Sequence, residues 1–84
     1  MQVVDVMGTT HKIEVGQEVF IPCKGRGGHG AWAFITKVKR KTFEAEERKG
    51  SYIPGTKWSV HMNATFAIVE RPQGKAWMKH WIND

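Results

Sequence analysis

The chain has 84 residues, a formal net charge of +5 and 40% hydrophobic residues. This length corresponds to one domain, residues 1–84, and the apolar content is too high for a disordered chain. The longest apolar run is far shorter than the roughly 20 residues of a membrane-spanning helix, so we expect no contact with a membrane. The single cysteine, Cys23, cannot form an internal disulfide, and no leader sequence is evident. These two features predict a cytoplasmic location.

The first 15 residues predict a β-hairpin. Residues 3–6 are rich in valine, and residues 8–10 have the composition of a turn. Ile13 and Val15 then alternate with charged residues, which gives one apolar and one polar side.

Residues 18–24 predict a strand that leads into a loop rich in glycine. Pro22 cannot donate a backbone hydrogen bond and therefore belongs at a strand edge or end. Four glycines among residues 25–30 allow positive φ angles and the close approach of another backbone or a phosphate. The loop lacks the Gly-Lys-Ser/Thr ending of a Walker motif and precedes a strand. A flexible binding loop and a plain long turn both remain open.

The next predicted strand, residues 31–39, alternates small and aromatic side chains. The small side, with Ala33, often faces the interior of a tight barrel, where strands approach closely. Trp32 and Phe34 are then expected on the outer face. Val38 breaks the alternation if it is buried, which predicts a bulge or a bend.

A basic turn at residues 39–41 leads to the returning strand, residues 42–47. In this strand we expect one side to be apolar and Glu44, Glu46 and Glu47 to be solvated. A loop is predicted at residues 48–56. Two further strands are predicted at residues 57–61 and 66–70.

Residues 75–83 predict a short C-terminal helix. Trp77 and Trp81 are four residues apart and would share a helical face that must dock to be stable. The predicted fold is therefore a single all-β domain. It consists of a small barrel of five to six strands over about residues 15–70, with an N-terminal hairpin and a C-terminal helix.

Three segments carry a resemblance to a known family. Residues 15–19 read V-G-Q-E-V, residues 33–43 read A-F-I-T-K-V-K-R-K-T-F, and residues 57–60 read K-W-S-V. They resemble a V-G-x-x-V entry, a basic hairpin and a W-x-V strand in the SH3-like barrels of small bacterial and phage proteins, a group that includes KOW-type modules. The resemblance implies an SH3-like barrel. It implies no particular activity, because this barrel hosts many unrelated functions.

Positive charge is concentrated in the middle of the chain. Residues 19–43 contain no Asp or Glu and six cations, namely Lys24, Arg26, Lys37, Lys39, Arg40 and Lys41. If the fold brings the glycine loop and the basic turn together, these cations form a patch that binds phosphates mainly through charge. His29 in the glycine loop would assist. The alternative is a solvated hairpin tip that only keeps the turn soluble.

The aromatic residues have two interpretations. Trp32, with Phe34, would stack on unpaired bases if it is exposed beside the cations. Otherwise it covers the core beneath the C-terminal helix. Trp77 and Trp81 would pack there too, or would form a docking face for another protein or for a second copy of the chain.

No pattern for catalysis or for metal binding is present. The four histidines lack metal-ligand spacing, and Cys23 beside Pro22 is more typical of a buried small residue than of a nucleophile. We therefore predict no enzyme, no cofactor and no metal. The predicted function is non-catalytic binding of DNA or RNA. The alternative is a protein-interaction module, such as a phage-encoded modulator or inhibitor of a host enzyme complex. Aromatics beside residues 39–41 favour nucleic acid, and aromatics on a neutral face favour protein.

Overall fold

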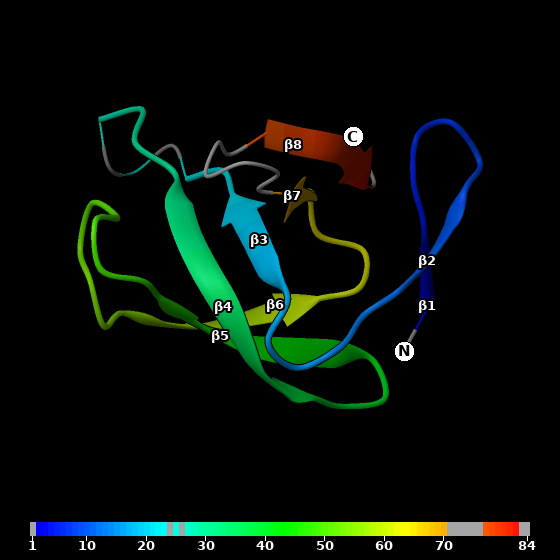
Figure 1. Ribbon diagram of the computed structural model, residues 1–84, viewed down its shortest axis with the longest axis horizontal. Coiled ribbons are helices and arrows are strands. Elements are labelled where there is room, and N and C mark those ends of the chain that lie inside the picture. The colour runs from blue at the N-terminus through cyan, green and yellow to red at the C-terminus, as the bar shows by residue number, and fades with distance from the viewer. Residues whose placement is uncertain (1, 24, 26, 71–76, 83–84) are drawn as a thin grey trace.

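The computed structural model describes residues 2–23, 25 and 27–70, and the backbone of residues 77–82. This part of the chain is all-β and contains no α-helix. It forms eight strands: β1 (Gln2–Val4), β2 (Thr10–Lys12), β3 (Glu18–Ile21), β4 (Ala31–Val38), β5 (Thr42–Glu47), β6 (Lys57–His61), β7 (Phe66–Glu70) and β8 (Trp77–Ile82). β1 and β2 form a two-stranded sheet, and the other six pair in the order β6-β5-β4-β3-β7-β8 (Figure 1). All pairs are antiparallel.

The predicted N-terminal hairpin is confirmed, although its second strand begins earlier than expected, at Thr10. Its turn is organised by Asp5, whose buried carboxylate Oδ1 accepts hydrogen bonds from the backbone N–H groups of Met7 and Thr9. The other oxygen, Oδ2, lies 2.6 Å from Nε2 of His11 across the hairpin. A short polar side chain that bonds to its own turn in this way is a common substitute for backbone pairing.

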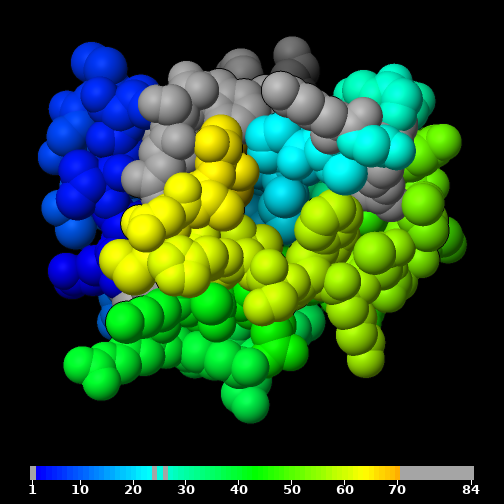
Figure 2. Space-filling view, turned by 180° about the vertical axis from the view of Figure 1, so that it is seen from behind, coloured from blue at the N-terminus to red at the C-terminus, as the bar shows by residue number. Residues whose placement is uncertain are grey.

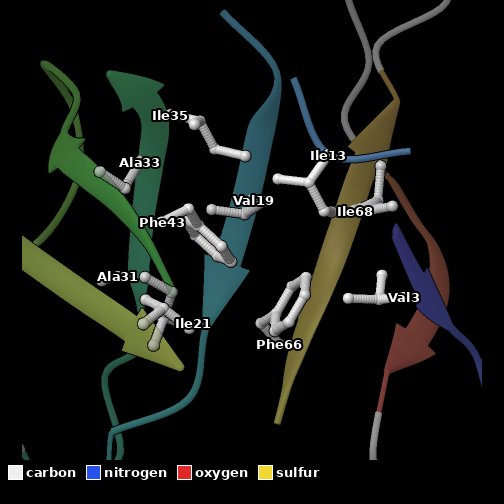
Figure 3. Close-up of a cluster of buried hydrophobic side chains, with 12 residues drawn as sticks. Val3, Ile13, Val19, Ile21, Ala31, Ala33, Ile35, Phe43, Phe66 and Ile68 are labelled. Carbon is white, nitrogen blue, oxygen red and sulfur yellow. The ribbon is translucent and has the colours of Figure 1, made fainter. Parts of the chain in front are cut away.

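The core lies on one face of the main sheet. The small side of β4 is the interior, as predicted, because Ala31, Ala33 and Ile35 are all almost fully buried. Phe43 and Phe66 fill the space opposite these small residues, with their rings edge to face and 5.1 Å apart between centroids (Figure 3). Burying a side chain of this size stabilises the fold by about 1.5–3 kcal/mol.

The N-terminal hairpin covers part of this core. Val3 and Ile13 are buried in the same cluster, where they lie near Ile68 of β7 (Figure 3). The hairpin therefore contributes to the domain through these two apolar side chains rather than by pairing with the larger sheet.

The bulge predicted near Val38 is present. The β4–β5 register shifts between Ile35 and Lys37, so that Thr36 is the extra residue. Beyond the bulge, Val38 packs against the core and Lys37 takes the next position on the outer face. The bulge thus keeps apolar side chains inside while it turns the basic residues outward.

The prediction of a C-terminal helix is wrong, because residues 77–82 form strand β8, which pairs with β7. Two physical reasons favour the strand. The segment is too short for a helix to be stable without extensive docking. In addition, β7 is buried on both faces, and its free edge would leave backbone groups unpaired without a neighbouring strand.

The predicted closed barrel is not seen either. Within the described part of the chain, the outermost strands β6 and β8 are not paired with each other, so the six-stranded sheet remains open. The five strands from β3 to β7 do lie within the segments predicted from the sequence.

A buried carboxylate organises the loop between β5 and β6. Glu47 is only 2% exposed, which contradicts the expectation that it is solvated. It follows Phe43 and Ala45 on the inward side of β5, and its carboxylate accepts three hydrogen bonds. Oε2 accepts from Ser51 Oγ (2.7 Å) and Ile53 N (3.1 Å), and Oε1 accepts from Trp58 Nε1 (2.9 Å). The donors satisfy a charge that would otherwise be costly to bury.

We predict that Glu47→Ala lowers the free energy of unfolding by about 2–4 kcal/mol, because several buried donors would lose their acceptor. Urea denaturation followed by tryptophan fluorescence measures the change. The neighbouring substitution Glu46→Ala is the control, and it should cost less than about 0.5 kcal/mol because Glu46 is exposed. Equal stability of the two variants would show that the network around Glu47 does not hold the loop.

Candidate nucleic-acid interface

The basic tip, which we define as residues 39–41, forms the turn between β4 and β5. The turn is closed by a hydrogen bond of 2.8 Å from Lys39 N to Thr42 O. Lys39, Arg40 and Lys41 are all exposed. Lys39 Nζ lies 3.1 Å from Glu44 Oε2, and both side chains are about half exposed, so this ion pair contributes little to stability. Within the described part of the chain, no ion pair involves Arg40 or Lys41.

The basic tip and the glycine loop lie at opposite ends of β4. The loop precedes Ala31, and the tip follows Val38. Eight strand residues at about 3.3 Å each separate the two ends by roughly 25 Å, and Figures 1 and 2 show the two segments well apart. The single patch expected if the ends converged is therefore not formed by the tip and His29. Lys24 and Arg26 lie outside the described residues.

His29 stacks on an aromatic ring from another loop. Its imidazole lies 4.3 Å from the ring of Tyr52, with an angle of 15° between the planes. This contact joins the glycine loop to the loop between β5 and β6, and Figure 2 shows these segments side by side. Both side chains are exposed, so together they form a small aromatic surface at the end of the sheet far from the basic tip.

The glycine loop uses one of its glycines for internal packing. A Cβ on Gly30 would overlap Cζ and Cε1 of the Phe20 ring. Gly27 and Gly28 have positive φ angles of 63° and 89°, which suit a tight turn. The glycine composition is thus explained in part by the requirements of the fold.

Trp32 is half-buried and packed among its neighbours. Its ring lies 4.8 Å from that of Phe20, and the Arg48 guanidinium carbon lies 5.6 Å from the Trp32 ring. Arg48 in turn donates from Nε to Glu18 Oε2 at 2.7 Å. Trp32 therefore stabilises the outer face at the glycine-loop end. Trp77 and Trp81 belong to β8, and their side chains lie outside what the structure describes.

Phe34 is the aromatic side chain of β4 that faces solvent, with 42% of its surface exposed. It pairs with Glu46 of β5 on the outer face, and Lys37 pairs with Glu44 on the same face. Phe34 thus lies between Trp32 and the basic tip.

His61 is a polar neighbour of the tip that the sequence analysis did not select. It pairs with Thr42 in the β5–β6 register, and the next residue, Met62, donates its N–H to Lys41 O at 2.9 Å. The alternation of β6, with Trp58 and Val60 turned inward, is a signal that His61 faces outward. Its place beside the tip depends on strand pairing, which the sequence does not show.

Other kinds of site find no support among the described residues. They contain no cluster of three His, Cys, Asp or Glu side chains that could hold a metal, and no pocket. No helix in this part of the chain has the length and apolar character needed to cross a membrane.

Comparisons with protein families, with curated proteins and with solved structures found no match to this chain. The functional argument therefore rests on the residues themselves.

We predict that Gly30→Ala destabilises the protein by about 1–3 kcal/mol, because the added methyl group would displace the Phe20 ring. Thermal and urea unfolding measure the effect. Gly25→Ala in the same loop is the matched control: the new methyl group would meet no atom within 4 Å, and the expected change is within about 0.5 kcal/mol. If both variants are as stable as the original protein, the loop does not depend on the contact with Phe20.

Proposed function

We propose that the protein is a non-catalytic nucleic-acid-binding module that contacts phosphates with its basic tip and with Lys37. The observation that supports this function is the concentration of exposed charge at the end of β4. Four cations occur in five residues, and one carboxylate, Glu44, is paired with one of them. A tip of this kind attracts phosphates and releases their counterions.

The tip supplies affinity rather than sequence recognition. Lysine and arginine side chains on a solvated turn contact the backbone of DNA or RNA, which carries no base information. His61, beside the tip, adds one further polar side chain. We therefore infer binding with little sequence preference and with a strong dependence on salt.

A second candidate function is protein interaction, and a specific observation favours it. The rings of His29, Tyr52 and Trp32 lie at the other end of β4 from the tip, and Arg48, whose guanidinium lies beside Trp32, is paired with Glu18. Aromatic residues are enriched in protein interfaces. A host complex or a second copy of this chain would be the partner, with Trp77 and Trp81 as further candidate contacts.

The relation to SH3-like, KOW-type modules of bacterial and phage proteins also stays a proposal, as does a cytoplasmic location. What supports the relation is that residues 33–43 fall in the β4–β5 hairpin and that residues 57–60 fall in β6, the strand paired with it.

We predict that the triple variant Lys39→Ala, Arg40→Ala and Lys41→Ala binds DNA and RNA more weakly and with a lower slope of log affinity against log salt. If each side chain contacts one phosphate, the slope falls by roughly 2–3 units. Fluorescence anisotropy with a labelled oligonucleotide, between about 50 and 200 mM salt, provides the measurement.

The charge-matched control is Lys12→Ala, Lys49→Ala and Lys57→Ala. It removes three exposed cations that lie away from the tip and should change the slope much less. Equal effects of the two triple variants would show that net charge alone, and not the tip, governs binding. No binding by the unaltered protein at low salt would contradict the function and favour the protein-interaction alternative.

A further inference from the structure

The outer face of β4 places an exposed aromatic ring next to the cations of the tip. Phe34 and Lys37 are consecutive positions on this face because the bulge at Thr36 shifts the register between them. Same-face neighbours in a strand are about 7 Å apart, and the extra residue extends this to roughly 10 Å. A nucleotide whose base lies on Phe34 therefore carries its phosphate within reach of the Lys37 side chain.

Trp32 is less suited to this contact. Its ring already packs against Phe20 and lies beside Arg48. Phe34 is 42% exposed and points away from Ala33 and Ile35, so truncating it removes little of the core. A solvent-facing ring beside cations is the arrangement with which proteins bind unpaired bases.

Carboxylates border the same face. Glu46 lies opposite Phe34 on β5, and Glu44 lies opposite Lys37. A duplex laid along this face would bring its phosphates against these acids, because phosphates form the exterior of a double helix. A single strand can instead turn its bases toward the sheet and its phosphates toward the tip. Carboxylates then accept hydrogen bonds from the amino groups of bases, as they do from cytosine.

We propose that the nucleic acid is single-stranded and crosses the outer face of β4, with one unpaired base stacked on Phe34 and the adjacent phosphates on Lys37 and the basic tip. This inference rests on the proposed function and deepens it. The acidic border formed by Glu44 and Glu46 disfavours double-stranded ligands.

The experiment measures the affinity of Phe34 variants for a labelled 12-nucleotide single strand, as DNA and as RNA, and for the matching DNA duplex. Phe34→Leu keeps the apolar bulk and the fold but removes the ring. It should weaken single-strand binding by about 5- to 100-fold, the effect of losing one base stack, and leave the salt slope unchanged because no phosphate contact is lost. Phe34→Trp, which keeps an aromatic ring at this position, should bind the single strand about as tightly as the unaltered protein does.

Two controls sharpen the result. Ile53→Ala removes a similarly exposed apolar side chain in the loop between β5 and β6, at the far end of the sheet from the tip, and should not change the affinity. Glu46→Gln should bring the duplex affinity closer to the single-strand affinity, because it removes one carboxylate from the face.

The outcomes separate this inference from the function on which it rests. The inference is wrong if the duplex binds as tightly as the single strand. It is also wrong if Phe34→Leu does not change single-strand affinity. In either case the function of the tip stands, provided that the triple variant of residues 39–41 still lowers the salt slope. If the unaltered protein binds neither form, both are wrong. Loss of single-strand binding in Phe34→Leu, with recovery in Phe34→Trp, supports the inference.

Discussion

The packing of small side chains along β4 is the constraint on which the rest of the structure depends. Ala31 and Ala33 let β4 lie close to the aromatic core residues Phe43 and Phe66, and this fixes which side of the strand is interior. Because side chains alternate strictly in a strand, the same choice places Trp32 and Phe34 on the outer face. The candidate interface is thus a consequence of how the core is filled.

The two ends of β4 carry surfaces of different chemistry, one aromatic and one basic. At one end lie the rings of His29, Tyr52 and Trp32, and the Arg48 guanidinium beside Trp32 is paired with Glu18. At the other end, the basic tip has one ion pair, between Lys39 and Glu44, while Arg40 and Lys41 form none with the described residues. Phe34 lies between the two surfaces and is the one solvent-facing ring near the cations among the described residues of β4. This arrangement is why a nucleic-acid ligand and a protein partner would use different ends of the same strand.

Local patterns in the sequence were sufficient for the strands from β3 to β7, because alternation and turn residues report directly on which side is buried. They failed at the C-terminus for a specific reason. The spacing of Trp77 and Trp81 is typical of one face of a helix, whereas the strand depends on pairing with β7, which a local pattern does not contain. The burial of Glu47 was missed. This residue continues the inward alternation of Phe43 and Ala45, but its hydrogen-bond donors come from a loop whose path the sequence does not specify. The candidate site depends on strand pairing and on the distance between the ends of β4, neither of which a local pattern contains.

The bulge at Thr36 has a consequence for how this protein can change over evolutionary time. It allows Val38 to pack against the core while Lys37 and the basic tip remain outside, although β4 holds one residue more than the paired segment of β5. Substitutions of the exposed Lys37 and of residues 39–41 can alter the ligand, while the inward side chains of Ala33, Ile35 and Val38 keep the core intact. If the bulge were lost while Thr36 stayed in the chain, the side chains would alternate without interruption, and Lys37 would turn inward and Val38 outward. The backbone irregularity is therefore the element that must be retained for the surface to diversify.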